Sequence, residues 1–260
     1  MFRKETILFI ILAGFFVTNA LVAEFIGMKI FAFEATFGLN PLNWNLFGKS
    51  GTLDLTAGVL LWPIVFIMTD LINEYYGRKG VRILSYMTAI LIAYGFVMVY
   101  GAIHLEPASW WTGSLSSQGI ENAQTSFAGI FGQSNWIVVA SIVAFIVGQL
   151  LDVSVFHWIR RLTGDRYLWL RANGSTLVSQ FVDSFLVLYI AFVINPGTDW
   201  DTATWLSVGT VNLVYKFFAA VALTPLLYLV HAGIDRFLGK EASHRLRAVA
   251  AGEHDEAQAN

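Results

Sequence analysis

The apolar residues of this chain gather into six long runs that are separated by short polar segments. The runs cover residues 7–31, 54–75, 83–103, 134–159, 173–194 and 206–231. Each run approaches or exceeds the roughly 20 residues that an α-helix needs to cross a bilayer. The first run is too long for a signal peptide, and no small-residue cleavage site follows its apolar core. The pattern therefore predicts an all-α membrane protein with six transmembrane helices.

Composition supports this prediction and excludes other classes of protein. Of the 260 residues, 56% are hydrophobic and only 13% are charged, well below the roughly 25% charged residues of soluble domains. The chain has no cysteine, which excludes disulfides and thiolate metal sites. No basic surface with interleaved aromatic residues suggests a nucleic-acid partner. We therefore expect a lipid bilayer around the chain, and neither nucleic acid nor a cofactor as a partner.

The basic residues predict how the six helices are oriented. Most of them fall at one side of a six-helix arrangement: Arg3, Lys4, Arg78, Lys79, Arg82, Arg160, Arg161, Arg166, Arg171, Arg236, Lys240, Arg245 and Arg247. Because cytoplasmic loops carry the excess of Lys and Arg, both termini are expected in the cytoplasm. We expect one membrane domain over residues 1–235. Residues 236–260 are expected to form a cytoplasmic tail that is largely disordered beyond a short helix.

Two of the runs place an aspartate at the same distance from a basic pair. Asp70 lies eight residues before Arg78-Lys79, and Asp152 lies eight residues before Arg160-Arg161. At 1.5 Å per residue, each carboxylate lies about 12 Å inside its basic end. A charge at the centre of a membrane helix costs roughly 2.5–3.5 kcal/mol, which indicates a function. The shared pattern also suggests an internal repeat, although two helices that independently end in basic residues explain it equally well.

The fifth run carries the widest stripe of polar residues. Asn173, Thr176, Gln180 and Asp183 are spaced by three or four residues, which places them on one helical face. Hydrogen bonds between helices explain the small polar residues of such a face. They explain an aspartate near the midplane poorly.

Charged residues elsewhere offer partners for these carboxylates. In the sixth run, Asn212 and Lys216 are one turn apart, and Lys216 is a candidate counter-charge for Asp183, Asp152 or Asp70. Glu74 is four residues before Arg78, so a structural ion pair explains Glu74 as well as a functional role does. One lysine against three deep carboxylates leaves an acidic surplus. Such residues usually face a cavity and mark a path for a substrate or a proton.

Three further positions are unusual for a membrane helix. Trp62-Pro63 falls inside the second run and Pro225 inside the sixth, where a proline frees backbone groups that a cavity can use. Asn19 lies at mid-depth in the first run. Of these residues, Asn19 and Trp62 are added to the candidate site.

Two of the stretches resemble the signatures of a known family. Asp70, Glu74, Tyr76 and Gly77 fit an Asp-x-x-x-Glu-x-Tyr-Gly motif, and Gln149, Asp152, Val153 and Phe156 fit a Gln-x-x-Asp-Val-x-x-Phe motif. Both motifs are similar to those of the queuosine precursor transporter family, also called the vitamin uptake transporter family. The stretch from Asn173 to Asp183, Lys216 and Asn19 fit the same family, and the resemblance covers roughly residues 7–232.

The resemblance implies a multi-pass inner-membrane protein that imports 7-deazapurine precursors of queuosine: preQ0, preQ1 or queuine. The substrate site it implies, together with the residues chosen above, comprises Asn19, Trp62, Asp70, Glu74, Gln149, Asp152, Asn173, Thr176, Gln180, Asp183, Asn212 and Lys216. A carboxylate accepts the two adjacent donors of a guanine-like edge, a Gln or Asn amide donates to its carbonyl, and an aromatic ring stacks on the base. Assembly into an oligomer and the source of energy are left open.

Other functions fit part of the pattern. A substrate-binding subunit with a separate ATPase is one alternative, because six spans suit such a subunit and the chain has no P-loop. A channel or a proton-coupled carrier of another solute is a second. An intramembrane enzyme needs a nucleophile with a base, or a metal site, and the histidines lie at span edges or in the tail. We therefore expect a transporter and not an enzyme.

Overall fold

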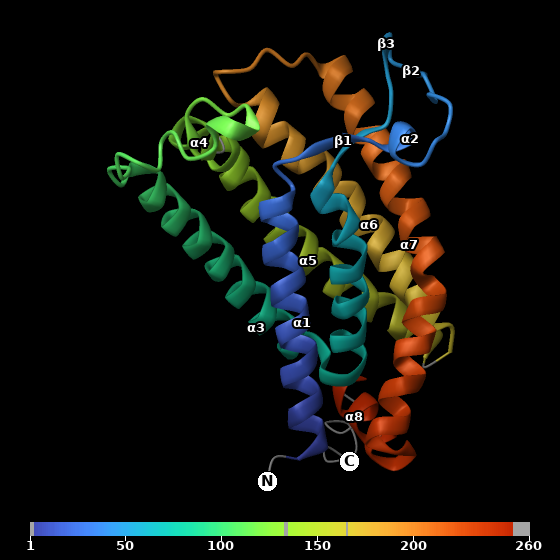
Figure 1. Cartoon of the computed structure of the whole chain (residues 1–260). Coiled ribbons are helices and arrows are strands. Elements are labelled where there is room, and N and C mark those ends of the chain that lie inside the picture. Colours follow the sequence, from blue (N-terminus) through green and yellow to red (C-terminus); the bar gives the residue numbers. More distant parts are fainter. Residues whose placement is uncertain (1–2, 133–134, 165, 252–260) are drawn as a thin grey trace.

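The computed structural model describes residues 3–132, 135–164 and 166–251, and helices dominate it (Figure 1). Five helical segments in this part of the chain are long and apolar enough to cross a membrane. They are α1 (Lys4–Ile26), α3 (Trp62–His104), α5 (Asn135–Thr163) with the preceding α4 (Ala123–Phe131), α6 (Leu168–Leu188) with the π-helical turn Tyr189–Val193, and α7 (Thr202–Leu238). The short 3-10 helix η2 (Ser116–Gln118) precedes α4. An all-α membrane protein is thus confirmed as the fold class.

The second and third predicted spans form one helix, α3, that reverses direction at Gly77. Gly77 has φ 66° and ψ −170°, a conformation that residues with a Cβ rarely adopt. From this residue both arms of α3 run toward the same end of the molecule, one inside the bundle and one along its edge (Figure 1). The loop expected at residues 77–82 is therefore reduced to a kink, which is why the five long helices fit six apolar runs.

The first arm of α3 begins later than the apolar run predicts. Residues 54–61 of that run form strand β4 (Asp54–Thr56), the 3-10 helix η1 (Ala57–Leu60) and a turn at Leu61. Pro63 consequently lies in the first helical turn, where the missing N–H has no intrahelical acceptor and costs little. The prediction that Trp62-Pro63 interrupts the middle of a span is wrong.

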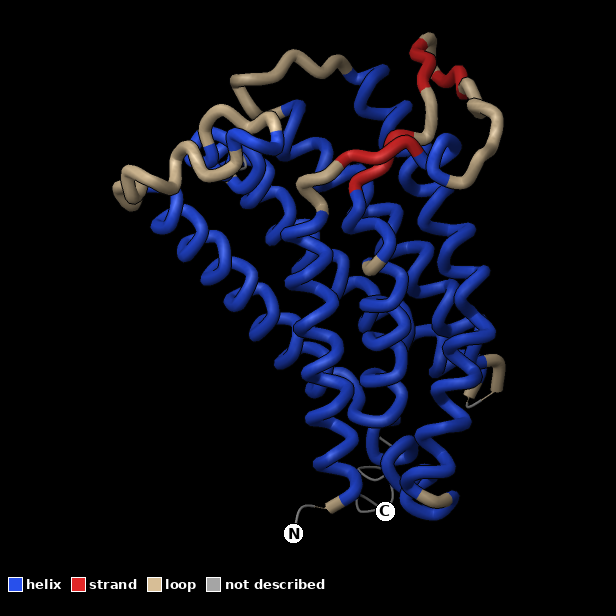
Figure 2. The backbone as a smooth tube through the Cα atoms, viewed as in Figure 1, coloured by secondary structure: helices blue, strands red, loops and turns tan. Residues whose placement is uncertain are grey.

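Two small antiparallel sheets lie at the end opposite the kink (Figure 2). Strand β1 (Ile30–Ala32) pairs with β4, and β2 (Trp44–Leu46) pairs with β3 (Lys49–Gly51). The short helix α2 (Phe33–Thr36) follows β1. The Ser207 hydroxyl of α7 donates to the carbonyl of Leu46 at 2.8 Å, which fastens the β2–β3 hairpin to the bundle. The first apolar run therefore ends at Ile26 and not near residue 31.

A last helix, α8 (Lys240–Ala251), packs at the kinked end of the molecule. Ala242 and Leu246 pack against the core, and Arg245 forms a 2.8 Å ion pair with Glu5 of α1. The start of α1, the Gly77 kink and α8 thus share one end, which we call the basic end (Figure 1). The disorder expected farther along the tail falls on residues 252–260, which lie outside the described residues.

The outer surface of the bundle is apolar. Ile83, Ile90, Val97 and Tyr100 on the second arm of α3 are all more than 60% exposed. Large exposed apolar surfaces mark contact with a partner or a membrane. The buried core lies instead between α1, α3, α5, α6 and α7, where polar residues are also enclosed.

Candidate functional site

Helices α3, α5 and α6 bring together polar side chains from three separate parts of the sequence. Gln149 and Asp152 are three residues apart on α5 and so share a face. On one side of them, the Thr69 hydroxyl of α3 donates to Gln149 Oε1 at 3.0 Å. On the other side, the Ser179 hydroxyl of α6 donates to Asp152 Oδ1 at 3.2 Å. Asp70 follows Thr69 along α3, and it interacts electrostatically with Asp152 of α5. The two aspartates that the sequence singled out are therefore placed near one another.

Several polar atoms of this group have no hydrogen-bond partner among the described residues. Asp70, Gln149, Asp152 and Gln180 are each at most 3% exposed. Their unpartnered atoms are Asp70 Oδ1, Gln149 Nε2, Asp152 Oδ2 and both Nε2 and Oε1 of Gln180. A buried polar atom without a partner costs about 1–3 kcal/mol, so these atoms need a reason. Together they offer acceptors and donors that a polar ligand can satisfy.

A small cavity lies beside this group. It is bounded by Asp70, Phe66 and Pro63 of α3, by Thr176 of α6, and by Leu227 of α7. Its volume of about 20 Å³ is enough for one water molecule. Pockets for small organic ligands are about 300–1,000 Å³. The cavity is therefore too small for a planar base, which would enter only if the helices moved apart.

Asn173 forms the link between α6 and α7 at the edge of this cavity. Its amide donates to the Thr224 hydroxyl at 3.0 Å, and both residues line the cavity wall. The polar residues predicted on one face of the fifth span therefore differ in burial. Thr176 and Gln180 are buried, whereas Asn173 is half-buried and already bonded.

Lys216 pairs with the aspartate at the far end of the same stripe. Its Nζ lies 2.5 Å from Asp183 Oδ2, with side-chain exposures of 14% and 22%. Of the three carboxylates predicted as partners, the lysine therefore takes Asp183. Asn212 lies one turn before Lys216 on α7 and is half-buried.

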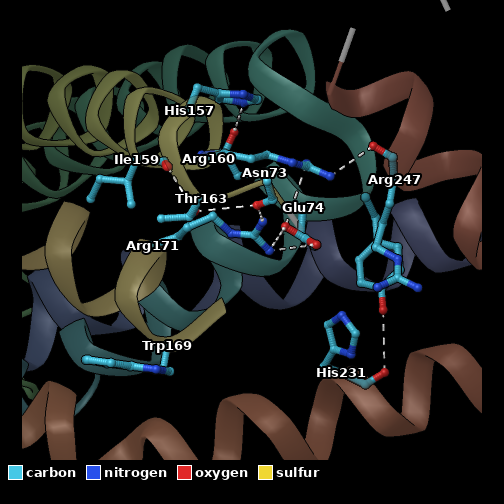
Figure 3. Close-up of polar contacts among 12 residues, drawn as sticks. Asn73, Glu74, His157, Ile159, Arg160, Thr163, Trp169, Arg171, His231 and Arg247 are labelled. Carbon is cyan, nitrogen blue, oxygen red and sulfur yellow. Dashed lines mark hydrogen bonds and ion pairs between the residues drawn. The ribbon is translucent and has the colours of Figure 1, made fainter. Parts of the chain in front are cut away.

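Glu74 belongs to an ion-pair cluster at the basic end (Figure 3). Arg171 Nη2 lies 3.1 and 3.0 Å from the two carboxylate oxygens of Glu74, and Arg160 Nη1 lies 3.7 Å from Oε2. All three side chains are at most 5% exposed. The i,i+4 pair of Glu74 with Arg78 does not form, so that alternative is wrong.

Sequence reasoning missed the burial of Arg171, although a signal was present. Arg171, Ser175 and Ser179 are spaced by four residues, which places the arginine on the buried face of α6. Because two small polar residues, Ser175 and Ser179, share this face, the spacing predicts that Arg171 also points into the bundle.

More bonds tie the helices together around this cluster. His157 Nε2 lies 2.8 Å from Asn73 Oδ1, and Arg160 donates to the carbonyl of Arg247 in α8 at 3.2 Å (Figure 3). The Tyr75 hydroxyl donates to Asp235 of α7 at 2.7 Å. These contacts join α3, α5, α6, α7 and α8 at the basic end. Among the described residues, no group of three or more His, Cys, Asp or Glu side chains is placed to hold a metal ion.

Two of the candidate residues lie apart from the central group. The Asn19 amide donates to the carbonyl of Phe15 within its own helix at 2.8 Å. Trp62 begins α3, and its ring packs against Phe145 with centroids 5.8 Å apart. Neither residue lines the cavity beside Asp70.

Comparison with known proteins points to one family. The sequence profile of the family described as "Putative vitamin uptake transporter" matches residues 56–230. A probable queuosine precursor transporter of Bacillus subtilis is 34% identical over 187 residues, which cover 71% of this chain and 73% of the relative. A queuosine precursor transporter of Escherichia coli is 26% identical and covers 74% of this chain and 80% of the relative. No solved structure matches the chain.

Proposed function

The chain belongs to the vitamin uptake transporter family, and from this premise we propose that it imports queuosine precursors across a membrane. The substrates would be small 7-deazapurine bases that are used for tRNA modification, namely preQ0, preQ1 or queuine. The similarity to queuosine precursor transporters supports this substrate class. The chemistry of the central polar group supports it independently.

The observation that carries the proposal is the set of unpartnered polar atoms on α3, α5 and α6. A guanine-like edge presents two adjacent donors, N1–H and the exocyclic amine, and next to them a carbonyl acceptor. The carboxylate of Asp152 or Asp70 can accept both donors. The amide nitrogen of Gln149 or Gln180 can donate to the carbonyl. A base would thus satisfy atoms that the protein leaves without partners.

We assign the remaining candidate residues to supporting roles. Thr176 and Asn173 would form the wall of the opened cavity next to α7. The Asp183–Lys216 pair, with Asn212 one turn away, would set the charge at the far side of the site. Trp62 and Asn19 lie outside the group and would contribute only after a rearrangement.

The charge distribution supports an orientation for this transport. With α3 counted as two arms, the chain would cross the bilayer six times. The basic end would face the cytoplasm, because Lys and Arg accumulate on that side. The Glu74 cluster, closed by Arg171 and Arg160, would then form a gate between the site and the cytoplasm (Figure 3). The protein would reside in the inner membrane.

Uptake into cells that make no queuosine precursor tests the proposal. The readout is queuosine in tRNA after each of the three bases is supplied. We expect a signal with wild-type protein, a loss of about 10- to 100-fold in uptake for Asp152→Asn, and a loss of about two- to tenfold for the neutral residue in Gln180→Ala. A hydrogen bond to a charged group contributes about 1.5–3 kcal/mol, and each 1.4 kcal/mol is about tenfold.

Asp199→Asn is the matched control, because Asp199 is an exposed loop residue. It makes the same change of charge away from the site and should leave uptake unchanged. The absence of queuosine with all three bases, in cells with normal amounts of protein in the membrane, would refute the substrate class. Unchanged uptake in both site variants would refute the assigned site.

A further inference from the structure

We propose that the Asp70–Asp152 pair binds one proton that is transported together with each neutral base. The inference rests on the proposed function and adds the source of energy for it. One base and one proton would enter from the outer side, and both would leave at the basic end. No covalent bond to the base changes, so each cycle moves one positive charge inward when the base is neutral.

Neither aspartate of the pair is neutralised by a direct contact with a cation. No ion pair joins Asp70 or Asp152 to a cation among the described residues. Asp152 is fully buried and accepts one hydrogen bond from Ser179, while its Oδ2 has no partner. Asp70 is 3% exposed, and its Oδ1 has no partner. An ionised carboxylate buried in this way is costly unless it is paired or neutralised.

The cations packed around the pair already have anionic partners. On α6 and α5, Arg171 and Arg160 both contact Glu74 (Figure 3). On α7, Lys216 contacts Asp183 of α6. Within the described residues, these cations therefore form no ion pair with Asp70 or Asp152.

The charged groups that face the pair reinforce this conclusion. Asp70 interacts electrostatically with Asp152 on α5, Glu74 on α3 and Arg171 on α6. Two of these three groups are acidic. The hydroxyls next to Asp152, from Ser175 and Ser179 of α6, are uncharged. Like charges that share a low-dielectric site cannot both stay ionised without a large cost, so one proton on the pair is the smallest change that removes the repulsion.

The same proton is compatible with binding of a base. One carboxylate of the pair must be ionised in order to accept the N1–H and amine donors. The other aspartate would carry the proton and would act as a donor itself. The pair therefore offers a place for one base and one proton at the same time. Sodium is the main alternative to the proton as the coupling ion, so the experiment also applies a sodium gradient.

The experiment uses the purified full-length protein in liposomes that contain a pH-sensitive dye. Counterflow of labelled preQ0, a neutral nitrile, is measured first and without a gradient, because it reports transport alone. A pH gradient with an alkaline interior is then applied, and potassium with valinomycin clamps the voltage. We expect preQ0 to accumulate up to about tenfold for each pH unit of the gradient, because one proton per base supplies about 1.4 kcal/mol per pH unit.

The outcomes separate the two proposals. An absence of counterflow with preQ0, preQ1 and queuine would refute the proposed function. Counterflow without accumulation in a pH gradient, or accumulation in a sodium gradient alone, would refute proton coupling while leaving the proposed function intact. Proton entry that accompanies base entry one to one would support both.

Variants then assign the proton to the pair. Asp70→Asn and Asp152→Asn should lower counterflow and reduce the number of protons per transported base toward zero. Asp70→Glu keeps the carboxyl group and should restore a ratio of one. Asp199→Asn is the control and should behave like wild type. If both Asn variants still move one proton per base, the pair is not the proton carrier.

Discussion

Lys216 and Asp183 form an ion pair of 2.5 Å between α7 and α6. Lys216 is the only lysine of the sixth apolar run, and it pairs with Asp183 and not with Asp70 or Asp152. The central acids are therefore distinguished from Asp183 by their lack of a counter-charge. Three carboxylates that look equivalent in the sequence therefore lie in two different environments in the structure.

Removing Lys216 should destabilise the protein more than removing the whole pair. Lys216→Met leaves Asp183 without its cation, and we expect a loss of about 1–3 kcal/mol. This is less than the roughly 3–5 kcal/mol for a fully buried pair, because both side chains are partly exposed. The double variant Asp183→Asn with Lys216→Met should recover most of the loss. Thermal unfolding of all four proteins in detergent gives the coupling energy, and strictly additive effects would contradict a direct pair.

Neutralising Glu74 and neutralising Asp70 should have opposite effects on stability. Glu74→Gln leaves Arg171 and Arg160 without the carboxylate that contacts both of them, at a cost of about 3–5 kcal/mol. Asp70→Asn removes a buried charge that has no ion pair, so stability should be unchanged or higher. Uptake should fall in both variants.

The measurement is the melting temperature of the two purified variants, compared at equal detergent and pH. Asp199→Asn again serves as the control for a change of charge at an exposed position. A lower melting temperature for Asp70→Asn than for Glu74→Gln would mean that Asp70, and not Glu74, is the structural residue. Our assignment of the two acids would then be reversed.

The helices and the central acids could be predicted from the sequence because each depends on local properties. Apolar runs of about 20 residues determine where a chain crosses a membrane, and spacings of three and four place Asn173, Thr176 and Gln180 on one face. Partners across helices could not be predicted in the same way. The choice of Asp183 for Lys216 depends on how far α6 and α7 are shifted along each other, which periodicity does not contain.

The error about Glu74 has a specific physical cause. An i,i+4 ion pair requires continuous helix between its members. Gly77 lies between Glu74 and Arg78 with φ 66° and ends the helical register there. The arginine is therefore turned away, and Arg171 of α6 takes its place. The glycine is visible in the sequence, but the sequence does not show that it adopts a positive φ there.

Glu34 of α2 should make the segment that carries the two small sheets sensitive to acid. Burial raises the pKa of the Glu34 carboxyl, but hydrogen bonds from the amides of Leu53 and Leu42 outweigh it, and the pKa lies below its ordinary value of 4.5. A carboxyl with a lowered pKa stabilises the folded segment above pH 4.5, and the stabilisation is lost as the pH falls through the lowered pKa. We expect faster hydrogen exchange around Leu42 and Leu53 below pH 4.5.

Glu34→Gln isolates this effect. The variant should exchange about three- to tenfold faster around Leu42 and Leu53 at pH 7, because hydrogen bonds to a charged acceptor are the stronger ones. It should also lose the extra acceleration in acid. The peptide that covers Ala123–Phe131 has no ionisable side chain and corrects for intrinsic exchange. Equal acid sensitivity in wild type and variant would exclude Glu34 as the responsible group.

Gly77→Ala should destabilise the kink of α3 by two separable mechanisms. The positive φ with ψ −170° costs a residue with a Cβ about 1–3 kcal/mol. In addition, a Cβ at this position would lie 3.1 Å from the carbonyl oxygen of Ala250 and 3.3 Å from its Cα. We therefore expect a lower melting temperature in the full chain. In a chain that ends after Leu238 and lacks α8, the penalty should shrink to the conformational part.

Gly101→Ala provides the matched control on the same helix. Gly101 is helical, and no atom lies within 4 Å of the position that its Cβ would occupy. Alanine there should stabilise the helix by about 0.5–1 kcal/mol. If Gly77→Ala were tolerated as well as Gly101→Ala, the two arms of α3 would not depend on the conformation of Gly77. If its penalty were equal with and without α8, the contact with Ala250 would contribute nothing to closing the basic end.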